Sequence, residues 1–386
     1  MLELIFDNKN KYAYAANQST IDLLRNSHVG TFANDRLILS TEELLYALEV
    51  RGAKCTTTNG KKLSFGDVAK KFQKDKKFLA RYFTYKDWKD KGLAIIAPTK
   101  LQFAKPAEIP IKRYPTGKIN LRAYKLEGIF FPDDLITIAG DEEQGRKIYE
   151  DYWFGQYGTY KAIDHGMLNK LDIFETLFLI KHSVLKISNQ DFKSIMEFAV
   201  KRRADFKKLF SVYCDWRDRN YIVKSGFKFG THFRIYFPGA QPIKNDNWVH
   251  SRHVLHVFPR DAKLLISEWA RAIRVAHSVR KTFILAIPGK SRRKNLNVDF
   301  LLYHRKGAEV EQPGKDQPKY AMLSFSEEEF IGGAELSALI NEAKKLGCQA
   351  IIAIADRESS VTYYKAKMIE LPGSSYEYYE IDWMQP

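Results

Sequence analysis

The stretch FKKLFSVYCDWRDRNYIVK, residues 206–224, decides the fold, because an earlier stretch of the chain repeats it. Residues 78–96, FLARYFTYKDWKDKGLAII, carry tyrosine, aspartate, tryptophan and a second aspartate at the same spacing. The aligned pairs are Tyr85 with Tyr213, Asp87 with Asp215, Trp88 with Trp216, and Asp90 with Asp218. Because a repeated segment indicates a repeated structural unit, the chain is predicted to begin with a relative of its own central part.

The segments before the two copies also follow one order. STEELLYALE and FETLFLIKH read as short helices, and KLSFGD and KISNQD follow them. Serine is a preferred first residue of helices, so Ser64 and Ser188 are predicted to cap the next helix in each unit.

A second repeat links the centre of the chain to its C-terminal part. Residues 270–287, ARAIRVAHSVRKTFILAI, match residues 337–355, SALINEAKKLGCQAIIAIA, and both read as a helix followed by a buried strand. When Ala286 is aligned with Ala353, Lys281 falls on Cys348. The C-terminal unit therefore keeps the helix and the strand but lacks the lysine.

These repeats predict a mixed α/β (α+β) fold of three related units, each built from small mixed sheets packed with helices. Segments rich in proline, glycine and charge, at 106–118 and 306–319, are predicted linkers. The units are then 1–112, a degenerate N-terminal copy; 119–305, the complete one; and 317–386, a shorter structural α/β unit.

Composition and termini bound the class of protein. The 386 residues are 45% hydrophobic and 28% charged, as in ordinary globular proteins. Acidic residues interrupt the first residues where a signal peptide needs an apolar core, and no apolar run reaches the roughly 20 residues of a membrane span. The three cysteines lie far apart, which indicates a reducing compartment. We therefore expect a cytoplasmic protein with no membrane partner.

Positive charge is concentrated in the middle of the chain. The net charge is +16, and residues 201–305 alone carry 23 Lys and Arg against 7 Asp and Glu. Aromatic side chains alternate with these cations in FKFGTHFRIYFPG, residues 227–239. A merely solvated basic face is the alternative, but this alternation favours a surface that binds a polyanion such as nucleic acid.

Five of the nine histidines lie between His232 and His277. A zinc site made by His250, His253 and His256 is one interpretation of HSRHVLH. However, RHVLHVF has strand character, and side chains alternate faces along a strand, so His253 would point away from the other two. No cysteine or HExxH pattern completes the set, and we expect no metal.

The segment after Pro259 is predicted to be a helix with one apolar face. Its core residues would be Leu265, Trp269, Ala272, Ile273, Ala276 and Val279. Arg271, Arg274 and His277 would share the exposed face with Lys281. At the C-terminal end of the helix, Lys281 is either a simple cap or a fixed cation that stabilises developing charge.

Three segments, in this order, resemble the archaeal type of tRNA-splicing endonuclease. They are FGTHFRIYFPG at 229–239, WVHSRHVLHVF at 248–258 and RVAHSVRKTFILAI at 274–287. The resemblance is strongest over residues 206–287. LILSTEELLYALE at 37–49, the 78–96 segment and IIAIADRESSVTYYK at 351–365 extend it over nearly the whole chain.

The resemblance implies a catalytic set of Tyr236, His250 and Lys281, acting without metal or other cofactor. His253 and His256 are the fallback candidates for the histidine. Such a set supports attack of a ribose 2′-hydroxyl on the adjacent phosphate, giving 2′,3′-cyclic phosphate and 5′-hydroxyl ends. That reaction needs an acid, a base and a cation. The resemblance favours His250 as acid and Tyr236 as base, although the residues alone leave the reverse open.

The resemblance also implies contacts to precursor tRNA with a bulge–helix–bulge. Arg274 matches an arginine that stacks on an unpaired base, and Arg292 or Arg293 in GKSRRKNLN is a candidate for its partner. From the glycine loop GQYGTYKAIDHG at 155–166, Lys161 and Tyr160 could reach RNA, although an ordinary surface loop is the alternative.

Because the substrate has two bulges and the chain has one Tyr–His–Lys set, a homodimer is expected. The acidic segments ADRESS, 355–360, or SSYEYYEIDWMQP, 374–386, would dock on the basic middle unit, within or across the dimer. Two other classes stay open. One is a non-catalytic RNA-binding or structural subunit, and the other is a metal-dependent nuclease, for which we find no convincing ExK pattern.

Overall fold

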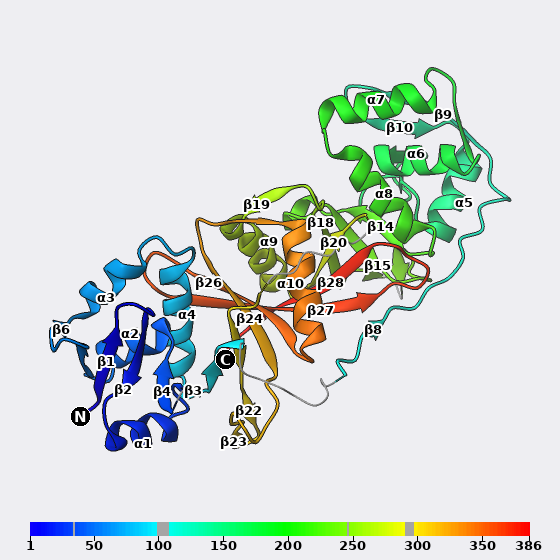
Figure 1. Cartoon of the computed structure of the whole chain (residues 1–386). Coiled ribbons are helices and arrows are strands. Elements are labelled where there is room, and N and C mark those ends of the chain that lie inside the picture. Colours follow the sequence, from blue (N-terminus) through cyan, green and yellow to red (C-terminus); the bar gives the residue numbers. More distant parts are fainter. Residues whose placement is uncertain (34, 99–107, 245–246, 290–296) are drawn as a thin grey trace.

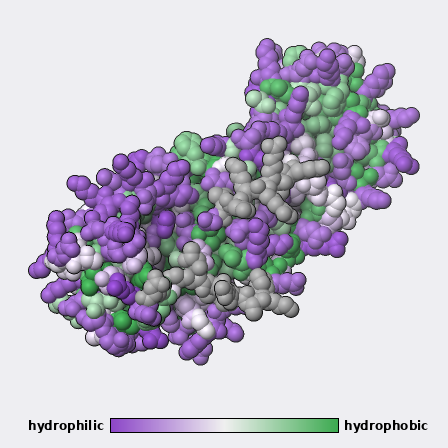
Figure 2. All heavy atoms as spheres, viewed as in Figure 1, coloured by the Kyte–Doolittle hydropathy of each residue, from purple (hydrophilic) through white to green (hydrophobic). Residues whose placement is uncertain are grey.

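The computed structural model describes residues 1–33, 35–98, 108–244, 247–289 and 297–386, and all statements below concern these residues. It confirms the predicted mixed α/β class, since helices pack on several mixed sheets (Figure 1). In the described ranges, no helix is long and apolar enough to cross a membrane. Hydrophilic side chains cover most of the face seen in Figure 2.

The N-terminal lobe is a six-stranded sheet in the order β3-β4-β2-β1-β5-β6, packed with four helices. Strand β1 pairs antiparallel with β2 and parallel with β5. The strands are β1 Glu3–Asp7, β2 Tyr12–Ala15, β3 Thr31–Ala33, β4 Arg36–Leu39, β5 Lys54–Thr57 and β6 Lys62–Leu63. The helices are α1 Gln18–Asn26, α2 Thr41–Glu49, α3 Phe65–Phe72 and α4 Phe78–Asp90.

A second lobe, at the opposite end of the molecule in Figure 1, repeats this topology in the order β11-β12-β10-β9-β13. Here β9 pairs antiparallel with β10 and parallel with β13, as β1 does with β2 and β5. The strands are β9 Leu126–Phe131, β10 Ile136–Ala139, β11 Gln156–Tyr157, β12 Asn169–Asp172 and β13 Leu185–Ile187. The helices are α5 Glu142–Tyr152, α6 Ile173–Lys181, α7 Phe192–Arg202 and α8 Phe206–Arg217.

The predicted helix starts are right for one copy and wrong for the other. Ser64 caps α3 in a reciprocal arrangement with Asp67. Ser188 does not cap α7, because Asp191 accepts from the amide of Ser194 at 2.7 Å and takes that role. The hydroxyl of Ser188 instead donates to the carbonyl of Gly128 at 3.3 Å. Aspartate and serine are about equally good N-caps, so position decides, and Asp191 directly precedes the helix.

The two copies of the Tyr–Asp–Trp–Asp motif are used in the same way. Asp87 in α4 accepts from the hydroxyl of Tyr363 at 2.6 Å, and Asp215 in α8 accepts from the hydroxyl of Tyr378 at 2.6 Å. Trp88 and Trp216 are both fully buried. Both helices are therefore docked, through the equivalent aspartate of the motif, on strands from the C-terminal part of the chain: α4 on β27, Val361–Glu370, and α8 on β28, Glu377–Met384.

Those strands belong to an 11-stranded sheet that joins the middle and C-terminal parts of the chain. Its main path is β14 Ile222–Ser225, β15 Phe233–Tyr236, β18 His253–Val257, β20 Thr282–Ile287, β28 Glu377–Met384, β27 Val361–Glu370, β26 Gln349–Ala355, β24 Tyr320–Ser326, β21 Phe300–Leu302 and β7 Ile95–Ile96. Strand β8, Lys112–Arg113, pairs with β27 off this path. Short pairs join β16 Ile243–Lys244 to β17 Asn247–Trp248, β19 Lys263–Leu265 to β25 Phe330–Gly332, and β22 Arg305–Lys306 to β23 Glu309–Val310.

The predicted second repeat is present as helix α9, Ile266–Ser278, running into β20 and helix α10, Gly333–Lys345, running into β26. Both helices end alike. Arg280 and Gly347 adopt left-handed conformations with φ of 54° and 69°. The amides of Lys281 and Cys348 then donate to the carbonyls of Ala276 and Ala343. The alignment of Lys281 with Cys348 is therefore also a structural one, and each ending is a Schellman-type stop.

The acidic segment 374–386 folds within the chain, since it contains β28, which pairs with β20 and β27. Glu377 forms an ion pair with Arg260 of the middle segment at 2.5 Å. The predicted domain bounds stay a prediction, but two pairings cross them. Strand β7 of the N-terminal segment pairs with β21, and β20 pairs with β28.

Candidate active site

The sheet topology brings the three candidate catalytic residues to one edge. Tyr236 ends β15, Lys281 immediately precedes β20, and His250 lies three residues before β18. Strand β15 is antiparallel to β18, and β18 is parallel to β20. The end of β15 and the starts of β18 and β20 must therefore lie at the same edge of the sheet.

Ser251, which no sequence pattern indicated, links two of these residues. The ammonium of Lys281 donates to the carbonyl oxygen of Ser251 and, at 3.2 Å, to its hydroxyl. Burial raises the pKa of Tyr236, and hydrogen bonds from Ser251 to that tyrosine act against this rise. Because Ser251 directly follows His250 and is buried, it fixes the backbone beside that histidine.

Burial raises the pKa of Tyr236, which would keep it neutral and unable to accept a proton. The strongest opposing effect comes from Arg234, two residues earlier on the same strand, whose charge lowers that pKa. Its guanidinium donates to the Tyr236 hydroxyl at 3.4 Å, and it is held in place by the carbonyl of Ser225 at 2.7 Å. Arg234 thus favours the tyrosinate form, a role that no motif in the sequence indicates.

Lys281 is held as a cation in a partly buried position. Burial, and then the charge of Arg234, lower the pKa of its ammonium. The contacts to Ser251 and a cation–π contact to Phe229, at 4.6 Å from the ring centre, favour the charged form. The left-handed turn at Arg280 aims the lysine at this edge, which a continued helix would not do.

Among the three histidines of HSRHVLH, His250 is exposed, His253 is buried and His256 is partly buried. The ring of His253 packs against Tyr114 and Phe237, and burial lowers the pKa of His253 to about 4. Burial likewise lowers the pKa of His256 to about 4, and its ring lies 4.3 Å from that of His232. The described residues hold no cluster of three His, Cys, Asp or Glu side chains that could hold a metal ion.

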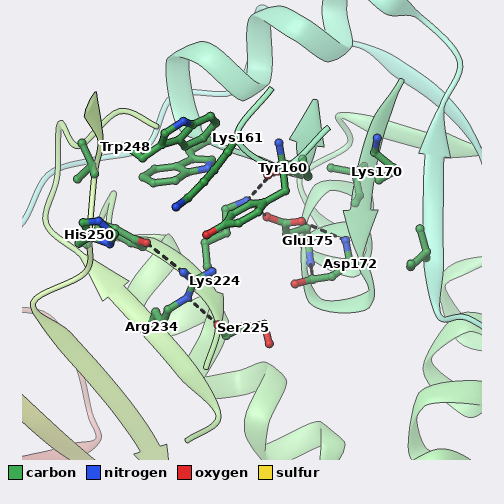
Figure 3. A pocket seen from close by; sticks show the side chains of 17 residues that line it. Tyr160, Lys161, Lys170, Asp172, Glu175, Lys224, Ser225, Arg234, Trp248 and His250 are labelled. Carbon is green, nitrogen blue, oxygen red and sulfur yellow. Dashed lines mark hydrogen bonds and ion pairs between the residues drawn. The ribbon is translucent and has the colours of Figure 1, made fainter. Parts of the chain in front are cut away.

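His250 and Tyr236 line a pocket of about 310 Å³ between the second lobe and the 11-stranded sheet. Trp153, Tyr160 and Trp248 give it aromatic walls. In Figure 3, Tyr160 and Lys161 point from their loop toward the side of the pocket where His250 and Arg234 lie. The ammonium of Lys161 is 5.7 Å from the Tyr160 ring centre. The pocket therefore combines flat apolar surfaces with cations.

A buried ion cluster forms one wall of this pocket and was also missed. Lys224 on β14 donates to Glu175 at 2.6 Å, and Asp172 caps α6 beside that glutamate. Burial, and then the charge of Glu175, raise the pKa of Asp172 to about 7. Lys224 is the register partner of Arg234, so this cluster connects the second lobe to the strand that holds Arg234.

Arg274, the candidate base-stacking arginine, is exposed on α9. Burial raises the pKa of Tyr364, and the charge of Arg274 and its hydrogen bond to that tyrosine act against this rise. Arg292 and Arg293 lie outside the described residues.

The predicted face of α9 needs correction. Val279 is exposed, and Leu265 and Ala272 are only partly buried, whereas Ile266 and Ala270 join the core because the helix begins at Ile266. His277 is partly buried against β28, where it accepts from the amide of Trp383 at 3.2 Å.

The sequence of this chain is similar to a known protein family and to several known proteins. A family model described as "tRNA intron endonuclease, catalytic C-terminal domain" matches residues 206–297. A protein of Methanopyrus kandleri named tRNA-splicing endonuclease is 35% identical over 146 residues, which cover 36% of this chain and 76% of that protein. A protein of Hyperthermus butylicus with the same name is 33% identical over 165 residues, covering 40% of this chain and 87% of the relative.

A longer relative from Methanococcoides burtonii, also named tRNA-splicing endonuclease, is 33% identical over 162 residues. That alignment covers 41% of this chain but only 43% of the relative. The matched family domain contains β15, β18, α9 and β20, and with them all the residues placed at the sheet edge.

Proposed function

Since this chain belongs to the tRNA-splicing endonuclease family, we propose that it cleaves precursor tRNA at intron boundaries, within the two bulges of a bulge–helix–bulge. The observation that carries the proposal is the gathering of Tyr236, Ser251-anchored Lys281 and exposed His250 at one sheet edge. The basic, aromatic-walled pocket beside them suits a polyanion with flat bases.

The reaction is proposed to need two bond changes and two proton transfers. The ribose 2′-oxygen gives its proton to Tyr236 and bonds to the adjacent phosphorus. The bond from phosphorus to the 5′-oxygen breaks, and that oxygen takes a proton from His250. The products are a 2′,3′-cyclic phosphate and a 5′-hydroxyl, so the class is an RNA endonuclease of lyase type. Lys281 stabilises the charge that develops on the non-bridging phosphate oxygens.

The function is tested with an end-labelled bulge–helix–bulge RNA and the full chain in EDTA. We expect a cut in each bulge and cyclic-phosphate ends, which resist phosphatase until acid opens them. Activity that requires added magnesium would indicate the metal-dependent nuclease instead. Activity that appears only with a second protein would indicate the non-catalytic subunit.

RNA contacts are proposed for Arg274, Lys161 and the arginines at 292 and 293. Arg274 is exposed on α9, the helix that leads to Lys281, and its planar guanidinium can stack on an unpaired base. Lys161 lies at the pocket that His250 lines. These four residues would act on binding rather than on the chemical step.

We propose that the working form is a homodimer, because two bulges need two catalytic sets and each chain supplies one. The loop that contains Asp356 and Glu358 is the proposed docking element. Glu358 is exposed and Asp356 is partly buried, and Asp356 accepts from the amides of Glu358 and Ser360 in its own loop, at 2.9 and 2.8 Å. Glu377 and Glu380, in contrast, are engaged within the chain, with Arg260 and with Lys112 and Tyr114.

The double variant Asp356→Lys/Glu358→Lys is therefore expected to lower the sedimentation mass from two chains toward one at micromolar concentration. Its melting temperature should stay near that of the wild type, because the two hydrogen bonds that Asp356 would lose lie within its own loop. The matched control is Asp133→Lys/Asp134→Lys, an equal charge change in another exposed turn. A variant that sediments as the wild type does would contradict the docking proposal.

Replacing Arg234 is expected to distinguish the base from the acid. Loss of its charge raises the pKa of Tyr236. If Tyr236 is the base, the single-turnover rate near neutral pH falls about tenfold for each unit by which that pKa rises, because less tyrosinate is present. If Tyr236 is the acid, the neutral rate does not fall for this reason, because the tyrosine is already protonated.

The measurement uses Arg234→Gln, with Arg234→Lys as the control that keeps the charge. Rates are measured against pH, and the pKa of Tyr236 is obtained from ultraviolet difference titration against Tyr236→Phe in each background. A neutral-pH loss that matches the measured pKa change supports Tyr236 as base. A raised pKa without a loss of rate would reverse the assignment.

A further inference from the structure

The turn between β14 and β15 presents an aromatic ring to solvent next to the candidate active site. This turn is η2, Phe227–Phe229, and Phe227 is 87% exposed, the largest exposed fraction among the large apolar side chains of the described residues. Such exposure of a phenylalanine costs hydrophobic stabilisation that burial would provide. Packing therefore does not explain why a phenylalanine stands at position 227, in the segment FKFG.

The turn is held rigidly rather than left loose. The amide of Phe229 donates to the carbonyl of Gly226 at 2.8 Å, and the amide of Gly226 donates to the carbonyl of His232 at 3.0 Å. A Cβ at Gly226 would lie 2.5 Å from the hydroxyl of Thr231, and Gly230 has a φ of 63°. Both glycines are therefore required for this shape, and the exposed ring is displayed on a fixed support.

Each neighbour of Phe227 in the turn makes a contact to the site. The ring of Phe229 lies under the ammonium of Lys281 at 4.6 Å. The ammonium of Lys228 lies 5.0 Å from the ring centre of Tyr160, which is part of the pocket wall. Ser225, just before the turn, accepts from Arg234. The turn thus joins the catalytic lysine, the pocket loop and the arginine beside Tyr236.

Three cations lie at this turn: Lys228 within it, Lys281 over the ring of Phe229, and Arg234, whose guanidinium donates to Ser225. A bare aromatic ring among fixed positive charges matches a nucleotide, whose base offers a flat face and whose phosphate carries negative charge. A protein partner would need apolar surface around the ring, whereas Lys228 and Ser225 on either side of Phe227 are exposed and polar.

We propose that Phe227 is a stacking platform for an unpaired nucleobase next to the phosphate that is cleaved. This inference rests on the proposed RNA-cleaving function and adds a base-binding position to it. The role belongs to binding and positioning, since Phe227 carries no group that could transfer a proton.

The test uses a bulge–helix–bulge RNA with 2′-deoxyribose at the cleavage positions, so that it binds but cannot react. The fluorescent base 2-aminopurine replaces each bulge nucleotide in turn, because stacking on an aromatic ring quenches it. With wild-type protein we expect quenching at one bulge position beyond that of the free RNA. In Phe227→Ala this quenching should disappear and binding should weaken about 5- to 150-fold, the range found for alanine replacement of base-stacking aromatics.

Two further variants make the test specific. Phe227→Trp should keep the quenching, because it keeps a flat ring. Phe330→Ala is the matched control, since Phe330 is also an exposed phenylalanine, at 61%. It lies on β25, which pairs with β19 at the N-terminal end of α9, whereas Lys281 follows the C-terminal end of that helix. Phe330→Ala should bind and quench as the wild type does.

The outcomes separate this inference from the proposed function. If the wild type cleaves the all-ribose RNA but Phe227→Ala keeps both quenching and affinity, the platform is wrong and the function stands. If the wild type neither binds nor cleaves this RNA, the proposed function fails and the platform fails with it. If Phe227→Ala leaves quenching unchanged but dissociates the dimer, the ring belongs to an interface between copies, and the inference is overturned.

Discussion

Replacing His250 by alanine is expected to lower the single-turnover rate of RNA cleavage about 10²- to 10⁴-fold, the range for loss of a general acid. Substrate affinity and melting temperature should change little, because the His250 side chain is exposed at the pocket and supports no core. His253→Ala and His256→Ala should instead lower the melting temperature, since their rings are packed against other aromatic rings.

A modified substrate makes the role of His250 explicit. If the 5′-oxygen that leaves is replaced by sulfur, the leaving group departs as a thiolate and needs no proton, because thiols are far more acidic than alcohols. We expect His250→Ala to cut this substrate nearly as fast as the wild type does, whereas Tyr236→Phe stays slow. A His250→Ala defect of equal size on both substrates would show that His250 is not the acid.

The second large effect is expected for Lys281. Lys281→Met keeps the length of the side chain but removes its charge, and we expect a rate loss of about 10²- to 10³-fold, as for other donors that stabilise developing negative charge. Lys281→Arg should recover only part of this loss, because the planar guanidinium cannot reproduce both contacts to Ser251.

The structure supplies a control for this second experiment. Removing Lys281 also releases Ser251, which could disturb Tyr236 and the backbone of His250. Ser251→Ala removes the hydroxyl but leaves its carbonyl oxygen as a partner for Lys281, so it should cost much less than Lys281→Met. If Ser251→Ala lowers the rate as strongly, Lys281 acts by holding Ser251 rather than by stabilising charge.

Much of the fold could be predicted from the sequence, because two motifs are repeated with fixed spacing. The Tyr–Asp–Trp–Asp pattern marked α4 and α8, and the structure adds that Asp87 and Asp215 meet equivalent tyrosines. The match of residues 270–287 to 337–355 marked two helix–strand units that also share the left-handed residue at 280 and 347. Local periodicity and spacing carry such information without knowledge of long-range contacts.

The parts that were missed depend on contacts between distant segments. Nothing in the local sequence distinguishes Arg234 from the other arginines of the basic segment. Its role comes from the register that places it beside Lys224 and from the hydroxyl of Tyr236 on the same strand. Ser251 acquires its role only when Lys281 arrives from a parallel strand. Likewise, Ser188 was predicted to cap α7, but Asp191 is the N-cap. Both residue types can cap a helix, and Asp191 is the one that directly precedes α7.

The pairing of α4 and β7 with strands from the far end of the chain bears on how the protein is made. Tyr85 and Trp88 are buried against residues of β21, β24, β26 and β27, which the ribosome adds more than 200 residues later. Strand β20 likewise gains its neighbour β28 only after some 90 further residues. The nascent chain therefore presents an apolar helix face and an open strand edge for much of its synthesis, a state prone to aggregation. We expect its folding yield to depend on chaperones that shield the nascent chain until translation passes residue 384.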